Sequence, residues 1–158
     1  MFNFGKTEEE SARLTAMEEN YAIISFKPDG TIIHANANFL NALGYTSSEV
    51  VGKHHRIFCD KKYINTSEYS EFWHNLAEGK SQIDEFERIR KDGASIWIQA
   101  SYTPVKNTSG KVTRVVKFAQ DITDSKQVID DVKKAIEIAK TGIMKQTITT
   151  STKNEGIE

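Results

Sequence analysis

The sequence predicts an α+β domain on a five-stranded antiparallel sheet with short helices on one side, and three observations predict it. Two β-rich runs come before residue 36 and three come after residue 80. Asp-Gly and Ser-Gly turn signals separate the runs of each group. The stretch between the two groups has helical spacing instead. Strands grouped around a helical middle favour antiparallel pairing, since alternation of strand and helix is the parallel pattern.

The first elements are a helix and a hairpin. Residues 7–20 are predicted to be helical, because Thr7 can cap the helix and three glutamates follow it at the positive helix terminus. Strands are predicted over 21–26 and 31–35. Gly30 lies in the turn between them, where a positive φ is needed, so the two strands form a hairpin.

The middle of the chain is predicted to hold three helices. Each has apolar residues at helical spacing or a capping residue at its start, and a glycine just beyond its end. The stretch before the third helix, 53–65, is polar and expected to be irregular. The predicted helices are 36–43, 46–49 and 66–78.

The last three strands are predicted over 81–90, 94–105 and 111–121. The second alternates between two sets of side chains, and a shift of one residue exchanges the faces of the two sets, so the sequence leaves open which set faces inward. One set is Ile96, Ile98, Ala100 and Tyr102, and the other is Trp97, Gln99, Ser101 and Thr103.

From Thr123 onward the pattern is helical, with an expected interruption at Thr141-Gly142. A narrow apolar seam is flanked by charged residues, which is typical of a coiled-coil contact. We therefore expect a homodimer through this helix. The seam consists of Val128, Val132, Ile136, Ala139 and Ile143.

Composition excludes several classes of protein. A formal net charge of −1 over 158 residues argues against a nucleic-acid binder. Cys59 is the single cysteine, so no intrachain disulfide is possible, and a reducing, cytoplasmic compartment is expected. No signal peptide and no apolar run long enough to span a membrane is expected. Neither a nucleophile elbow, a phosphate-binding glycine loop nor a metal-ligand spacing is present, so no enzyme activity is expected.

Several motifs together resemble the PAS family of sensory domains. They are the Asn36-x-x-Phe39 stretch ending in Gly44-Tyr45, Arg90-Lys91-Asp92-Gly93, and Asp121-Ile122-Thr123. The resemblance implies a PAS fold over residues 20–123, preceded by a helical cap over 1–19. Residues 124–158 would then be a signalling helix and the start of a HAMP-like element.

A closer resemblance is to the PAS domains of bacterial energy-taxis chemoreceptors. It rests on Gly52 to Asp60, on Tyr69-x-x-Phe72-Trp73 and on Trp97 to Pro104. These receptors control a chemotaxis kinase and its adaptor through a methyl-accepting coiled coil. Their aerotaxis branch binds FAD in the PAS pocket, and another branch binds haem.

The resemblance implies a set of site residues, and each also has an ordinary reading. The histidines could be loop residues, Trp73 could be core, Arg56 could be solvated, and Asn36 or Asp60 could be a helix cap. Asp121 and Thr123 would relay the signal to the helix. The implied cofactor contacts are Asn36, His54, His55, Arg56, Asp60, Trp73, Trp97 and Gln99.

The predicted function is an FAD-based redox or oxygen sensor that signals through its C-terminal helix. The alternatives are a haem-based gas sensor with an axial histidine and a ligand-free dimerisation module. A photoactive cysteinyl-flavin site at Cys59 is not expected, because the sequence around this cysteine lacks the motif that such sites carry.

Overall fold

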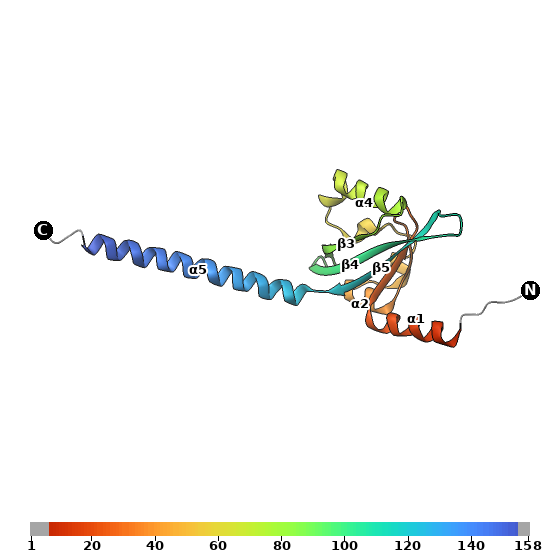
Figure 1. Cartoon of the computed structure of the whole chain (residues 1–158), viewed down its shortest axis with the longest axis horizontal. Coiled ribbons are helices and arrows are strands. Elements are labelled where there is room, and N and C mark those ends of the chain that lie inside the picture. Colours follow the sequence, from red (N-terminus) through yellow and green to blue (C-terminus); the bar gives the residue numbers. More distant parts are fainter. Residues whose placement is uncertain (1–6, 155–158) are drawn as a thin grey trace, which may run out of the picture. The chain divides into compact units, whose positions relative to one another are not determined.

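The computed structural model describes residues 7–154, and the side chains of residues 7–142. Its strands pair antiparallel throughout in the order β2-β1-β5-β4-β3, which confirms the predicted α+β class (Figure 1). The chain divides into two compact units after Ile122. The strands are β1 (Ala22–Phe26), β2 (Ile32–Ala35), β3 (Gln82–Ile89), β4 (Ser95–Lys106) and β5 (Val112–Asp121).

Helix α1 (Glu8–Asn20) begins with the expected cap, in which the Thr7 hydroxyl accepts the Glu10 N–H and the Glu10 carboxylate accepts the Thr7 N–H. Hydrogen bonds connect its C-terminal end to the start of the next helix. The Asn36 amide donates to the Tyr21 carbonyl at 2.8 Å and to the Glu18 carbonyl at 3.1 Å. The predicted N-terminal helix therefore packs by hydrogen bonds rather than through buried side chains, since none of its residues is buried.

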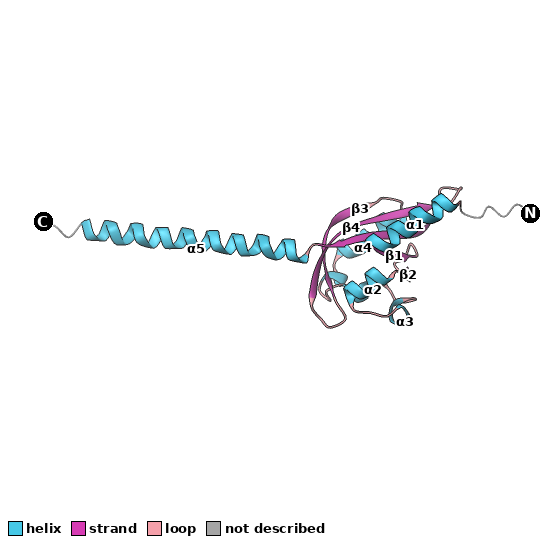
Figure 2. Cartoon of the chain, turned by 90° about the horizontal axis from the view of Figure 1, so that it is seen from below, coloured by secondary structure: helices cyan, strands magenta, loops and turns pink. Residues whose placement is uncertain are grey.

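The connection between β2 and β3 contains a series of short helices (Figure 2). The stretch predicted to be irregular, 53–65, contains two 3₁₀ turns instead. Single 3₁₀ turns are short enough to carry no apolar periodicity, so the sequence pattern did not reveal them. The elements are α2 (Ala37–Leu43), α3 (Ser47–Val50), η1 (His55–Phe58), η2 (Tyr63–Asn65) and α4 (Ser67–Ala77).

The register of β4 settles which of its two faces is inward. Tyr102 is fully buried, and Ile96, Ile98 and Ala100 are at most 3% exposed. Their neighbours in the other set, Trp97 and Gln99, therefore point to the opposite face of the sheet. This placement differs from the prediction that both contact an interior cofactor. The cause is the open register in the sequence, because a shift of one residue exchanges the faces of the two sets.

Helix α5 (Thr123–Asn154) is a single helix, so the expected interruption at Thr141-Gly142 is wrong (Figures 1 and 2). The Thr141 hydroxyl donates to the Glu137 carbonyl at 2.7 Å, which satisfies it within the helix. One glycine costs a helix only about 1 kcal/mol, and 32 residues absorb that cost. None of the helices within residues 7–154 is long and apolar enough to cross a membrane.

Candidate functional site

Helix α4 supplies the aromatic side chains that cover the inner face of the sheet. Tyr69, Phe72, Trp73 and Leu76 follow the i, i+3, i+4, i+7 pattern of one helical face, and all four are buried. The Phe72 ring meets Tyr102 of β4 edge-on at 4.9 Å between centroids, and Trp73 meets Phe26 of β1 at 5.3 Å. We call Phe26, Tyr69, Phe72, Trp73 and Tyr102 the aromatic cluster. The helical spacing of its members on α4 is visible in the sequence.

The 3₁₀ turn η1 places His55 in the middle of the aromatic cluster. Its ring is fully buried, and its backbone N–H donates to the Gly30 carbonyl at 2.9 Å. Gly30 has a φ of 88°, and a Cβ there would lie 2.7 Å from His54 Nε2 and 2.9 Å from Trp73 Cε2. Only glycine fits, since the turn needs a positive φ and the two rings occupy the space of a side chain.

Five side chains form a hydrogen-bonded chain through this interior, and Arg88 lies at one end of it. A guanidinium only donates, so Tyr102 Oη accepts from Arg88 Nη2 at 3.3 Å. The Tyr102 hydroxyl lies 3.0 Å from His55 Nε2, and His55 Nδ1 lies 3.1 Å from Tyr69 Oη. A neutral imidazole donates at one nitrogen and accepts at the other, so the direction of one of these bonds fixes the direction of the other.

The other end of the hydrogen-bonded chain assigns the direction. The Asp29 carbonyl only accepts, so His54 Nε2 donates to it at 2.8 Å. His54 Nδ1 is therefore an acceptor, and it receives the Arg56 N–H at 3.1 Å and the Tyr69 hydroxyl at 3.4 Å. Since Tyr69 donates to His54, its oxygen is left to accept from His55 Nδ1, and His55 Nε2 then accepts the Tyr102 hydroxyl. The two histidines are thus neutral and carry their hydrogens on opposite nitrogens.

Burial sets the protonation states of this interior. Burial, helped by the charges of Arg88 and Lys117, holds the pKa of His55 well below 6.5. Burial likewise holds the pKa of Lys117 well below 10.5, and it raises the pKa of Tyr102 to about 12. The Lys117 nitrogen lies 4.9 Å above the Tyr102 ring and 5.3 Å from the centre of the Phe39 ring. No carboxylate lies within ion-pair distance of Lys117 in the described residues.

Among the described side chains, two buried N–H groups, Trp73 Nε1 and Arg88 Nε, make no hydrogen bond of good geometry. The Trp73 N–H nevertheless lies near enough to the Tyr69 hydroxyl to oppose the rise that burial causes in the pKa of Tyr69. A buried donor without a partner costs about 1–3 kcal/mol, so such groups are uncommon in folded proteins and call for a physical account. Both point to the same chemistry, because each is a donor and each would be satisfied by an acceptor-rich group.

The structure brings together only part of the set of site residues expected from the sequence. His54, His55 and Trp73 are in mutual contact, with ring centroids 5.3–5.8 Å apart for the two pairs that involve Trp73. Asn36 is buried, but its oxygen accepts the Ile23 and Phe39 N–H groups, so its side chain holds the backbone together. The bond to Phe39 is that of a helix cap, the structural role that the sequence also allowed for Asn36.

The remaining expected residues lie away from the aromatic cluster. The side chains of Arg56 and Asp60 are exposed, and the Asp60 carboxylate accepts the Lys62 N–H at 2.7 Å. Trp97 and Gln99 lie on the opposite face of the sheet, as described above. Asp121 ends β5 with its carboxylate 3.5 Å from Arg90 Nη2, and Thr123 is the first residue of α5.

Sequence reasoning missed the two buried cations, Arg88 and Lys117. Each occupies an inward position of its strand, two residues from a buried or partly buried apolar neighbour. The signal was a charged residue within the apolar alternation, as in Phe86-x-Arg88 and Val115-x-Lys117. Charged residues are almost never fully buried unless paired, so each position was a candidate site in its own right.

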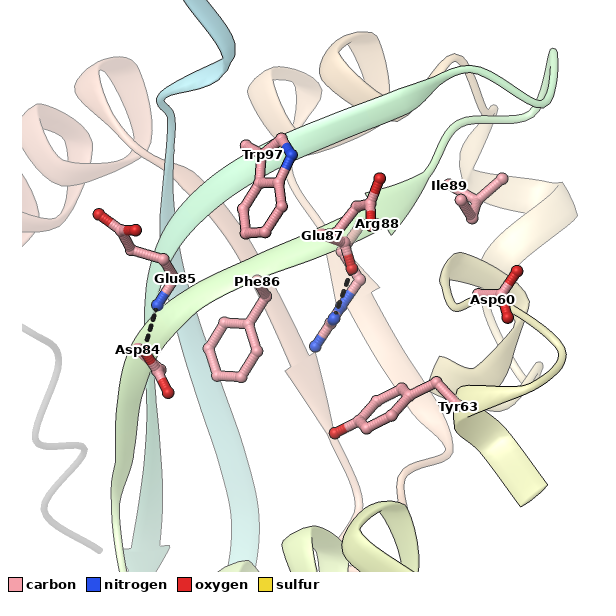
Figure 3. Close-up of a pocket in the computed structure, with 9 residues that line it drawn as sticks. All are labelled: Asp60, Tyr63, Asp84, Glu85, Phe86, Glu87, Arg88, Ile89 and Trp97. Carbon is pink, nitrogen blue, oxygen red and sulfur yellow. Dashed lines mark hydrogen bonds between the residues drawn. The ribbon is translucent and has the colours of Figure 1, made fainter. Parts of the chain in front are cut away.

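A pocket of about 400 Å³ opens beside the edge strand β3 (Figure 3). Arg88 and Phe86 line it from β3, and Tyr63 lines it from η2. Figure 3 shows the Arg88 guanidinium directed into the space between the Phe86 and Tyr63 rings. No group of three or more metal-ligating side chains occurs among the described residues.

Comparison with known proteins gives a family and several relatives. A family model described as "PAS domain" matches residues 20–124. The biofilm dispersion protein BdlA of Pseudomonas aeruginosa is 39% identical over 109 residues, which is 69% of this chain and 26% of that protein. The chain therefore spans about a quarter of the length of this relative.

Two solved structures share the fold. The PAS domain of a protein from Colwellia psychrerythraea superposes with a TM-score of 0.64 at 20% identity, over 74% of this chain and 99% of that one. A light-oxygen-voltage domain studied with a flavin analogue gives a TM-score of 0.61 at 20% identity, over 82% of this chain and 97% of that one. At these identities the likeness concerns the fold.

Proposed function

Because this chain belongs to the PAS domain family, we propose that it is the sensing and relay module of a chemotaxis-type signalling protein. It acts by binding rather than by catalysis. The observation that carries the proposal is the interior around His55, where the buried Trp73 N–H has no well-placed acceptor and the buried Lys117 has no carboxylate within ion-pair distance among the described residues. Such an interior is suited to an acceptor-rich, negatively charged ligand.

The ligand we propose is a flavin, and FAD in particular. The chemistry of the donor set fits it, since a flavin ring presents carbonyl and ring-nitrogen acceptors and its phosphates carry negative charge. Trp73 Nε1 would donate to it, and Lys117 would offset its charge. When bound, the flavin would supply a redox state that responds to oxygen. Because the aromatic cluster fills the space between α4 and the sheet, binding requires some of its side chains to move.

The haem alternative has less support. An iron ligand needs a free imidazole nitrogen. Both nitrogens of His55 are hydrogen-bonded to tyrosine hydroxyls, and both nitrogens of His54 are engaged with backbone groups. Ligation by either histidine would therefore break the hydrogen-bonded chain at its centre or at its end. The ligand-free module stays as the second candidate, because the aromatic cluster already packs the interior without a ligand.

The relay we propose runs along strand β5. Lys117 lies on the inner face opposite Tyr102, and the same strand ends four residues later at Asp121. A change at the interior would shift the end of β5, and Asp121 and Thr123 would pass the shift to α5. The receiving parts would be a chemotaxis kinase and its adaptor, reached through the rest of a longer signalling protein.

The test is extraction of the purified chain followed by chromatography and absorption spectroscopy. We expect FAD. Trp73→Ala should lower its occupancy several-fold, because the mutation removes a stacking surface and a donor of the interior. Trp97→Ala, on the opposite face of the sheet, is the matched control and should keep the occupancy. Recovery of FMN would keep a flavin and reject FAD, and a chain that stays colourless after reconstitution with both flavins would reject the proposal.

A further inference from the structure

The pocket beside β3 contains a buried cation that no carboxylate neutralises. Arg88 is only 3% exposed, and it donates to the Glu87 carbonyl at 2.7 Å and to Tyr102 Oη at 3.3 Å. None of the described residues places an acceptor on its Nε–H. Although four carboxylates line the same pocket, none lies within ion-pair distance of Arg88 in the part of the chain that the structure describes. A buried guanidinium without a counter-charge is costly, so the position favours an incoming carboxylate.

The walls of the pocket are aromatic and apolar around this cation. The guanidinium carbon lies 4.7 Å from the centre of the Phe86 ring and 6.0 Å from that of Tyr63. Ile89 adds to the apolar lining, and Trp97 borders the pocket across β3, on the opposite face of the sheet (Figure 3). A volume of about 400 Å³ is within the range of about 300–1,000 Å³ that small-molecule sites occupy.

The charges at the rim restrict what can enter. Asp60, Asp84, Glu85 and Glu87 would repel a polyanion such as a nucleotide or a dinucleotide. A simple cation would meet the positive charge of Arg88 inside. A molecule that carries a carboxylate and an ammonium on the same carbon satisfies both conditions, because its carboxylate reaches Arg88 while the neighbouring ammonium faces a rim carboxylate.

We propose that the pocket beside β3 binds a free α-amino acid with an apolar or aromatic side chain. Its carboxylate pairs with Arg88, its ammonium faces Asp60, and its side chain lies against Phe86 and Tyr63. The site does not depend on a flavin in the interior. It is nevertheless connected to that interior, since Arg88 also begins the hydrogen-bonded chain that leads through Tyr102 to His55.

The experiment is a calorimetric titration of the full chain with three probes that differ only in their charged groups. They are L-phenylalanine, phenylacetate, which lacks the ammonium, and 2-phenylethylamine, which lacks the carboxylate. We expect phenylalanine to bind at least tenfold more tightly than either fragment. Absence of binding at millimolar phenylalanine, or equal affinity of phenylalanine and phenylacetate, would overturn the proposal. So would tightest binding by 2-phenylethylamine, since that result makes the pocket a cation site.

Variants separate the two charged contacts. Asp60→Asn changes an exposed loop residue that the fold tolerates, and it should weaken phenylalanine about tenfold while leaving phenylacetate unchanged. Glu71→Gln, an exposed residue of α4 outside the pocket, is the matched control and should leave both affinities as they are. Arg88→Gln should abolish binding of both, with the fold checked by circular dichroism. If Arg88→Gln does not fold, the Asp60→Asn result decides: an equal loss for phenylalanine and phenylacetate, or no loss, contradicts the proposal.

Discussion

His54 and His55 are neighbours in the chain, but their side chains have different surroundings. His55 is fully buried between two tyrosine hydroxyls, whereas His54 is half-buried and packs against the hairpin turn at Gly30. Each accepts at one nitrogen and donates at the other, so the hydrogen-bonded chain contains no spare acceptor for an added proton. If His55 were protonated, its Nε2 would become a donor that faces the Tyr102 hydroxyl, beside the Arg88 N–H that already donates to the same oxygen.

The buried state of His55 makes stability depend on pH in a known direction. Because its pKa in the folded chain lies well below 6.5, the unfolded chain binds a proton in this range that the folded chain does not. The contribution is therefore fully present above pH 6.5 and is lost as pH falls below it, at up to about 1.4 kcal/mol per pH unit. Urea unfolding from pH 7.5 to 5 would measure this slope. His55→Phe should make it shallower, and an unchanged slope would contradict the assignment.

Gly30 is the residue where a small change should have the largest structural effect. Gly30→Ala adds a Cβ at positive φ and pushes it against the rings of His54 and Trp73, so we expect a loss of about 2–4 kcal/mol in unfolding free energy. Gly52→Ala is the matched control, with a φ of 80° and no atom within 4 Å of the added Cβ. It should cost about 1 kcal/mol from backbone strain alone. Equal losses in the two variants would show that the ring contacts at Gly30 are loose.

Lys117 is buried at a cost that the fold tolerates. Its contacts with two ring faces favour the ammonium by about 0.5–2 kcal/mol, but burial without a carboxylate costs more, which is why its pKa is lowered. Lys117→Met should raise the unfolding free energy at pH 7 by about 1 kcal/mol or more. The gain should shrink as pH rises toward 10.5, because the unfolded chain then gives up its proton too. Lys111→Met, at an exposed position, is the control, and a destabilised Lys117→Met would contradict this account.

At the scale of elements, helix α5 carries an apolar pattern that nothing within its own unit covers. The side chains of Val128, Val132 and Ile136 are 50–62% exposed. Ile143 lies beyond the residues whose side chains are described. Spacings of three and four residues also connect Ile129, Val132, Ile136, Ala139 and Ile143, which is the a and d pattern of a heptad. The predicted homodimer contact is consistent with this exposure and stays a prediction.

The dimer has a direct test in sedimentation velocity. We expect the full chain to associate, and a chain ending at Ser125 to run as a monomer. Val132→Lys and Ile136→Lys should abolish association, because each places a charge in the seam. Ile138→Lys is the matched control, since Ile138 is 72% exposed but lies off the heptad positions. Association that survives truncation would move the contact to α1, where Leu14 and Met17 are exposed.

At the scale of the whole molecule, the order of elements could be predicted from the sequence, whereas their contacts could not. Turn glycines and helix caps are local signals, and they placed the hairpins and the three α-helices between β2 and β3. The site depends on pairs far apart in the chain, such as His55 and Tyr102, 47 residues apart. That contact depends on the register of β4, which the alternation of side chains alone leaves open. Because the register was open, Trp97 and Gln99 were expected on the inner face of the sheet.

Strand β3 ends the sheet, with only β4 beside it, so one row of its backbone hydrogen-bonding groups is unpaired within the sheet. Its residue Ile83 is 74% exposed, and an apolar edge of this kind invites another chain to add a strand. Asp84, Glu85 and Glu87 occupy the same strand, and their like charges oppose the approach of an identical edge. Copies of the domain held close together by a paired α5 would therefore remain separate folded units instead of merging into one continuous sheet.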